Sequence, residues 1–416
     1  MKGARYRFVL IIILLGIVQG FGQSRPQARA GFLDARSWMF QDKRLPLNGY
    51  WKMIDSRLAG PDELGSHPSK DYFFPSTWNT SRANEAGEGY ATFYLHVLVP
   101  DSIRVWAIEI PQLYSSGKLW VNGQEVSTVG KVDTLAQHSV PQWIFDHGTV
   151  HAPSDTLLLV FQVSNFQHDK GGIKDPVYLG LPSVIYSNWN WALGTNLAEC
   201  IILLILGIGF SIFFYFNRKK VIIYFALLCL TWSVRCVFSG IYPVTVFFPD
   251  FHWAAQVRIE YLSLYLAIIW ATLFLNDLFR TFSSKALTHT LVVLNAFFAV
   301  FTLATAPVIF TEWVSLYLAV AGIVVVYGVV LIVRALLSEQ PGAWFLLASI
   351  LTGIVVFGYD IIAYQASFSY NFVFLNIGYL TIFLLTAIAL LFQVDVFKSR
   401  YRKRNMLTYQ DMFGGR

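Results

Sequence analysis

The chain has 416 residues, of which 55% are hydrophobic and 13% are charged, and this composition excludes an ordinary soluble protein. Its formal net charge is +6, but the excess of basic residues lies in the first 30 residues and after residue 190, whereas residues 31–190 are net acidic. The basic residues therefore form no groove for phosphates, and we expect a membrane as a partner and no nucleic acid.

The first segment, residues 1–22, has the three-part pattern of a secretory signal peptide. Three basic residues precede an apolar run over residues 8–18, which is too short to cross a membrane comfortably, and small residues follow. Cleavage after Gly22 and cleavage as late as Ala30 fit the pattern equally well. The alternative is an uncleaved eighth membrane span. A signal peptide predicts that the region after it is exported.

Residues 31–190 predict an exported all-β sandwich. Apolar and polar side chains alternate in short runs that end at Pro, Gly, Asn or Asp, which is the pattern of half-buried strands. The three cysteines, at positions 200, 229 and 236, all lie beyond this region, so it must fold around an apolar core without disulfide bonds. We expect strands over residues 93–99, 105–110, 118–121, 125–129 and 156–164.

Two polar segments of the sandwich are candidates for ligand contact. One is a predicted hairpin with an Asn-Gly pair at residues 122–123, which favours a type I′ turn. The other is a glycine-rich loop that begins at Asn165, where a strand ends. Loops at the end of a β-sandwich often bind ligands, but the Asn165 side chain could equally bond its own loop backbone. The candidate ligand-binding residues are Trp120, Asn165, His168, Gly171 and Gly172.

The second half of the chain, residues 193–393, predicts a bundle of seven membrane-spanning helices. Each apolar run has roughly 20 residues, which is enough for a helix to cross a hydrocarbon core. Basic residues follow the first, third, fifth and seventh runs, whereas the alternate loops contain no Lys or Arg. The positive-inside rule then predicts a sandwich outside the cytoplasm and a cytoplasmic C-terminus. The runs are residues 193–216, 221–241, 257–275, 287–306, 313–333, 343–364 and 372–392.

Five charged residues fall in the outer halves of these predicted spans. Charge inside a membrane is costly, so such groups normally pair or face a wet cavity. We expect an intramembrane polar cluster beneath the sandwich, in which Arg235 pairs with Glu260 or Asp360. The alternative is a set of side chains that reach to the membrane surface, plus one static ion pair. The five residues are Glu199, Arg235, Arg258, Glu260 and Asp360.

The order of signal peptide, β-sandwich and seven spans resembles the bacterial seven-transmembrane receptors with diverse intracellular signalling modules. The resemblance covers roughly residues 45–397 and implies that the sandwich is a jelly roll of the galactose-binding type, similar to the carbohydrate-binding domains of glycoside hydrolases. The architecture is more specific than any of the short stretches that share it. These stretches are residues 120–130, 163–172, 178–180, 275–279 and 376–378.

Members of that family usually continue after the seventh span into a histidine kinase, a diguanylate cyclase or a similar output domain. Here about 24 residues follow Phe392, too few for a catalytic domain, and residues 394–416 form a short basic cytoplasmic tail without a recognisable output domain. One interpretation is a helix that lies on the anionic inner leaflet. The other is a docking stub or a severed linker that serves a separate cytoplasmic signalling protein.

Together these features predict a signal-transducing receptor of the inner membrane rather than an enzyme. It would sense a carbohydrate or a small metabolite through the jelly roll and pass the signal through seven helices to a cytoplasmic partner. The sequence has no nucleophile elbow and no metal-ligand spacing, so we expect no catalytic residue, no metal and no cofactor. The alternatives are a transporter or channel accessory subunit and a membrane-tethered carbohydrate-binding protein. A homodimer and a monomer are both compatible with these features.

Overall fold

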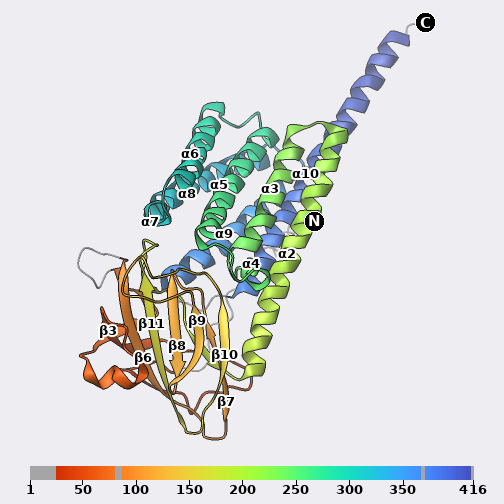
Figure 1. Ribbon diagram of the computed structural model, residues 1–416. Helices are drawn as coiled ribbons and strands as arrows, with labels where there is room; N and C mark the ends of the chain where they lie inside the picture. The colour runs from red at the N-terminus through yellow and green to blue at the C-terminus, as the bar shows by residue number, and fades with distance from the viewer. Residues whose placement is uncertain (1–24, 80–86, 367–370, 414–416) are drawn as a thin grey trace.

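The computed structural model describes residues 25–79, 87–366 and 371–413. It shows a β-sandwich packed against one end of a helical bundle (Figure 1). The predicted signal peptide, residues 1–22, lies outside the described residues. A chain order of strands first and helices afterwards is the arrangement expected when each part has its own core.

The sandwich has two main sheets and a small ribbon in the part of the chain that the structure describes. The large sheet has the order β4-β3-β6-β11-β8-β9, with β1 added in parallel to β6. Its strands are β1 (Phe32–Asp34), β3 (Gly49–Asp55), β4 (Lys70–Phe74), β6 (Gly89–Leu98), β8 (Ser116–Val121), β9 (Gln124–Val129) and β11 (Thr156–Asn165). The second sheet has the order β10-β7-β13-β2 and consists of β2 (Leu45–Pro46), β7 (Val105–Ile110), β10 (Asp146–His151) and β13 (Tyr178–Gly180). The ribbon pairs β5 (Ser76–Thr77) with β12 (Gly172–Ile173), and a 3₁₀ turn, η1, covers Pro61–Ser66.

The predicted strands are confirmed to within a few residues, because alternation exposes one face and buries the other. Phe93, Leu95 and Val97 of β6 are fully buried in one core with Trp106 and Ile108 of β7. This core joins the two sheets. The hairpin between β8 and β9 is also as predicted, since both residues of its Asn-Gly pair have positive φ angles, 50° and 79°.

The seven predicted spans are confirmed as seven helices that are long and apolar enough to cross a membrane in the described part of the chain. Two short helices, α4 (Pro243–Phe247) and α7 (Pro307–Glu312), lie in loops at the sandwich side of the bundle (Figure 1). The seven-helix arrangement shows a multi-pass membrane protein. The long helices are α2 (Pro182–Asn217), α3 (Lys220–Phe238), α5 (Trp253–Leu278), α6 (Lys285–Ala304), α8 (Val314–Leu337), α9 (Ala343–Ala366) and α10 (Phe372–Phe413).

Helix α2 joins the two domains more rigidly than the sequence predicts. It begins at Pro182, two residues after the end of β13, whereas the first apolar run begins only at residue 193. Proline is well suited to the first turn of a helix. Near this start, Ile185 is buried against Ala107 and Tyr178 of the second sheet. The junction between the predicted domains, at residues 191–192, is therefore part of a continuous 36-residue helix.

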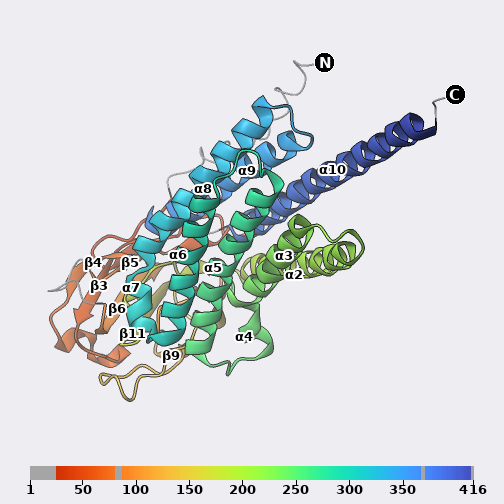
Figure 2. The ribbon, with the colours of Figure 1, turned by 90° about the horizontal axis from the view of Figure 1, so that it is seen from above.

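Helix α10 extends beyond the bundle at the end opposite the sandwich (Figures 1 and 2). It runs for 42 residues and includes most of the predicted tail. In both views the extension continues the line of the span instead of turning to lie across the end of the bundle. A straight extension of α10 differs from a tail helix that lies on a membrane surface. The extension fits better with the alternative of a docking segment or linker.

A candidate ligand site between the sandwich and the bundle

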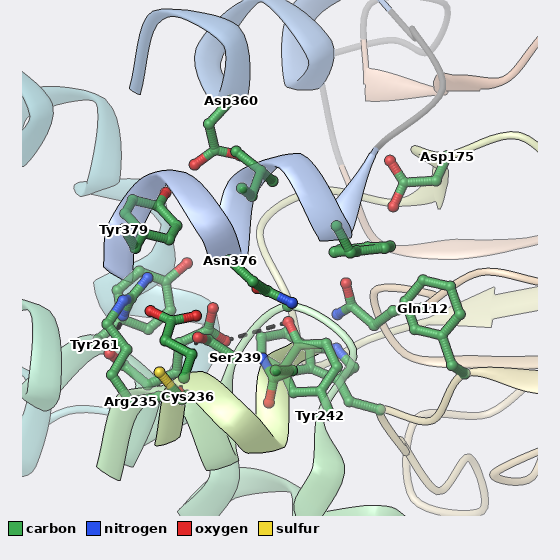
Figure 3. A pocket seen from close by; sticks show the side chains of 18 of the residues that line it. Gln112, Asp175, Arg235, Cys236, Ser239, Tyr242, Tyr261, Asp360, Asn376 and Tyr379 are labelled. Carbon is green, nitrogen blue, oxygen red and sulfur yellow. Dashed lines mark hydrogen bonds between the residues drawn. The ribbon is translucent and has the colours of Figure 1, made fainter. Parts of the chain in front are cut away.

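A cavity of about 240 Å³ lies where the sandwich meets the bundle (Figure 3). Both domains form its walls, so its geometry depends on how one packs against the other. The bundle contributes Glu199 from α2, Arg235 from α3, Glu260 from α5, Asp360 from α9 and Asn376 from α10. The sandwich contributes Gln112, Tyr114, Trp143, Phe145, His168, Lys174 and Asp175 from loops beside its second sheet and after β11.

Trp143 anchors the sandwich on the bundle. Its side chain is 3% exposed, and its ring lies 5.3 Å from Tyr242 and 5.9 Å from Trp253, measured between centroids. The indole N–H donates to the main-chain oxygen of Tyr114 at 3.0 Å, which fixes the ring against the loop between β7 and β8 of the sandwich. Offset and edge-to-face aromatic pairs of this kind add to the free energy of burial. Trp143 is thus a structural link between the cavity's two walls.

Polar contacts reinforce this link on both sides of Trp143. The Gln142 amide donates to the main-chain oxygen of Pro249 at 2.8 Å. The Gln256 amide, on the first turns of α5, donates to the main-chain oxygen of Trp143 at 3.4 Å. Further along the interface, the main-chain N–H of Asp169 donates to the Thr311 hydroxyl at 3.2 Å. The sandwich therefore contacts the bundle at α5 and α7 as well as through the cavity walls.

The glycine-rich loop after β11 is held together by Asn165. This side chain is 1% exposed, and its amide donates to the main-chain oxygens of Gly87, His168 and Lys170 at 2.7–3.1 Å. Its Oδ1 accepts from the main-chain N–H of His168 at 3.2 Å. The structure thus places Asn165 in the role of bonding its own loop backbone, which was one of the two sequence interpretations. Its hydrogen-bonding groups are directed at the loop rather than at the cavity.

The two glycines of this loop sit where the backbone approaches other groups closely. A Cβ atom on Gly171 would lie 2.0 Å from the main-chain oxygen of Gly87 and 2.2 Å from Trp78 Nε1. Gly172 has a φ of +96°, which side chains disfavour. Trp120 lies elsewhere, on β8, with the Lys118 ammonium 5.0 Å from its ring centroid. None of these three residues lines the cavity.

His168 is the one of the five sandwich candidates that lines the cavity. Its ring lies 4.7 Å from the ring of Tyr114, and its Nδ1 accepts a hydrogen bond from the main-chain N–H of Lys170 at 3.0 Å. Burial, reinforced by the charge of Lys174, lowers the pKa of His168 to about 3. His168 is therefore neutral at physiological pH and contributes an aromatic wall rather than a positive charge.

Four of the five residues of the expected polar cluster line this cavity, namely Glu199, Arg235, Glu260 and Asp360. Arg235 approaches Glu260 through the main chain, since its Nη1 donates to the Glu260 carbonyl oxygen at 2.7 Å. The Tyr242 hydroxyl donates to the Glu260 carboxylate at 3.3 Å. Arg258 lies apart from the cavity, and its guanidinium donates to the carbonyl oxygen of Thr305 at 3.0 Å.

Carboxyl groups outnumber cationic groups in the cavity walls that the structure describes. The carboxyl groups are Asp175, Glu199, Glu260 and Asp360, and the cations are Lys174 and Arg235. Burial raises the pKa of Asp175, and the charge of Lys174, whose Nζ is 3.9 Å from Asp175 Oδ2, opposes that shift. The cavity thus has an excess of hydrogen-bond acceptors and of potential negative charge.

Comparison with known families and structures gives one informative match. The family model for 7TM diverse intracellular signalling matches residues 197–393. The membrane domain belongs to this family. Comparison with curated proteins finds no match. Because the match begins at residue 197, the matched region includes most of the cavity's helical wall but not the sandwich.

Among solved structures, the chain is similar to several glycosidases. The β-glucuronidase of Faecalibacterium prausnitzii is 16% identical, with 33% of this chain and 31% of that chain covered and a TM-score of 0.26. The β-galacturonidase of Eisenbergiella tayi, bound to galacturonate, is 12% identical, with 35% and 26% covered and a TM-score of 0.25. The chain thus spans less than a third of the length of these enzymes, and likeness at this level carries no argument about function.

The sequence alone does not indicate the sandwich residues that complete the cavity. Gln112, Trp143, Lys174 and Asp175 lie in loops without a recognisable motif. Asn196 was missed as well, although it lies on α2 just one turn before Glu199. A signal for Asn196 did exist, because residues three apart share a helix face. The loop residues had no such signal, since only the tertiary fold brings them to the bundle.

Proposed function

We propose that this protein is a transmembrane receptor whose ligand binds in the cavity between the sandwich and the bundle. One observation carries the proposal: the walls of the cavity come from both domains. A ligand held there contacts the sandwich and five helices at once. Its affinity therefore depends on their relative arrangement, and binding favours the arrangement with the higher affinity.

Helix α10 is the route by which such a change would reach the other end of the bundle. Leu375, Asn376 and Tyr379 of α10 line the cavity, and the same helix continues to Phe413. Asn376 also ties α10 to α2, because its amide donates to the Thr195 hydroxyl at 3.1 Å. A displacement of the first turns of a straight helix is transmitted along its axis as a rigid-body movement. The extension then presents that movement to a partner.

The orientation in the membrane forms part of the proposal. Basic residues follow alternate helices at the end of the bundle that is opposite the sandwich, which supports a sandwich outside the cytoplasm and an α10 extension inside it. The partner that reads the movement is then a cytoplasmic signalling protein that docks on the extension. The ligand is a small polar molecule, because the cavity is small and has many acceptor groups.

Hydrogen–deuterium exchange of the full chain in lipid nanodiscs tests this function. Amino acids, organic acids, amines and monosaccharides are the probes. A binding probe is expected to slow exchange in residues 139–145 and 242–257 and to change it in residues 395–413. Ser239 lines the cavity, so Ser239→Trp should fill it and abolish both effects. Ser315→Trp, at an exposed position on α8, is the matched control. A probe that protects only sandwich loops away from the bundle would contradict the proposal.

A further inference from the structure

We propose that the ligand of this cavity is a small protonated amine, an inference that rests on the receptor function proposed above. The first observation is a group of buried oxygen atoms without hydrogen-bond partners among the described residues. They are Gln112 Oε1, Asn196 Oδ1 and Glu199 Oε2, on side chains that are 2%, 5% and 1% exposed. All three residues line the cavity. Buried polar atoms in folded proteins nearly always have a partner, so these atoms indicate a ligand that donates hydrogen bonds.

Among the three residues, Glu199 gives the strongest evidence for a ligand that donates hydrogen bonds. An amide can turn to present a donor or an acceptor, whereas the carboxyl group of Glu199, once ionised beside a bound cation, only accepts. Glu199 Oε1 accepts from the indole N–H of Trp232 at 3.1 Å. The Cys236 thiol also lies beside this carboxyl group, and Oε2 has no N–H or O–H partner among the described residues. A donor placed in the cavity next to Oε2 would complete the coordination of this carboxyl group. A positively charged N–H donor forms a stronger hydrogen bond with a carboxylate than a neutral donor does.

The distribution of charge favours a cation as well. The two cationic side chains of the walls are already engaged: Lys174 faces Asp175 at 3.9 Å, and Arg235 donates to the main chain of Glu260 at 2.7 Å. Among the described residues, Glu199 forms no ion pair within 4 Å. An anionic ligand would meet four carboxyl groups, whereas a cation would offset their excess.

The residues that line the cavity favour an organic amine over a metal ion as the ligand. No group of three His, Cys, Asp or Glu side chains in the described chain is close enough to hold a metal ion, so the carboxyl groups are too dispersed to act as metal ligands together. Aromatic rings also line the cavity, including Tyr114, Trp143 and Trp232. Aromatic faces attract ammonium groups and bury the alkyl part of an organic cation. A quaternary ammonium has no N–H for Glu199, which leaves protonated amines that carry at least one N–H.

The size of the cavity limits the ligand. A cavity of about 150 Å³ holds benzene, which has six heavy atoms. By proportion, the cavity of about 240 Å³ holds roughly ten heavy atoms. A hexose has twelve heavy atoms with its hydroxyl groups and exceeds this limit. Of the two ligand classes expected from the sequence, a carbohydrate and a small metabolite, a small amine belongs to the second.

Calorimetric titration of the full chain in phosphatidylcholine nanodiscs tests the inference with three four-carbon probes. 1,4-Diaminobutane is the cation, 1,4-butanediol its neutral counterpart and succinate the anion, while the zwitterionic lipid limits binding of the diamine to the membrane. We expect the diamine to bind at least about tenfold more tightly than the other two. We expect Glu199→Gln, which keeps the shape of the side chain, to weaken that binding by about 10- to 100-fold. Glu125→Gln, on the sandwich surface beside Lys118, should leave it unchanged.

Hydrogen–deuterium exchange on the same samples separates the two proposals. Tighter binding of the diol or of succinate, with slower exchange at residues 139–145 and 242–257, would overturn the amine and support the receptor. Diamine binding that Glu199→Gln does not change, or that leaves those residues unprotected, would overturn the amine site. Failure of the diamine to bind would also overturn the amine, and the wider set of probes would then decide on the receptor function by itself.

Discussion

Replacement of Trp143 by alanine should loosen the sandwich from the bundle while each domain stays folded. Trp143 belongs to a separate aromatic cluster with Tyr242 and Trp253 and not to the main sandwich core. Each of its two aromatic pairs with the bundle contributes about 0.5–1.5 kcal/mol beyond burial. The loss at the interface is then about 1–3 kcal/mol, out of the about 3–5 kcal/mol that truncation of a buried Trp costs in total.

Hydrogen–deuterium exchange of the full chain in nanodiscs measures this loss. A fall of about 1–3 kcal/mol in the opening free energy should speed exchange in residues 139–145 and 242–257 by roughly 5- to 150-fold. Exchange in β6 and β11 should change much less. Trp191→Ala is the matched control, because this Trp on α2 is 68% exposed. Unchanged exchange at the interface in Trp143→Ala would refute the reasoning, and so would equal acceleration throughout the sandwich core.

Three further predictions concern the loop after β11. Asn165→Ala removes the partners of the buried main-chain O and N–H of His168, so it should lower the free energy of unfolding of the sandwich by about 2–4 kcal/mol in denaturant titrations. A loss below about 1 kcal/mol would contradict this role. The pKa of His168 is lowered from 6.5 to about 3 in the folded protein, so protonation of this histidine favours the unfolded state. The free energy of unfolding should therefore be highest above pH 6.5. Below pH 6.5 it should fall by up to about 1.4 kcal/mol per pH unit. His168→Gln should reduce this loss of stability at acidic pH. A pH profile of the variant identical to that of the unchanged protein would contradict the lowered pKa of His168. Gly171→Ala places a Cβ against Gly87 and Trp78 and should cost at least about 1–3 kcal/mol, whereas Gly65→Ala, with open space around it, should cost less than about 1 kcal/mol.

The strands and spans were predictable because each depends on a local repeat. Alternation along 93–99 and 156–164 indicates β6 and β11, which pair with each other in the structure. The membrane spans follow from apolar runs that no soluble helix needs. The start of α2 did not follow, since residues 182–192 mix polar and aromatic side chains. Their helix is held by the sandwich, through Ile185, rather than by its own apolar content.

The candidate site was predictable only on its membrane side. Charged residues are conspicuous in apolar spans, so Glu199, Arg235, Glu260 and Asp360 could be grouped by depth alone. The depth of a residue in the membrane does not indicate the side of the helix on which its side chain lies. For this reason the prediction included Arg258, although Arg258 lies apart from the cavity. On the sandwich side, polar loops are common, and the sequence did not distinguish the residues that face the bundle. Asn165 stood out by its position, and its hydrogen bonds show a structural role.

Electron cryomicroscopy of the full chain in nanodiscs with saturating 1,4-diaminobutane tests whether the two domains share a ligand site. We expect density for the amine in the cavity, within hydrogen-bond distance of Glu199 Oε2 and enclosed by Trp143 and Asn376. We also expect a displacement of α10 relative to the map without the amine. Density on a sandwich surface away from the bundle, with the cavity and α10 unchanged, would contradict a ligand site shared by the two domains.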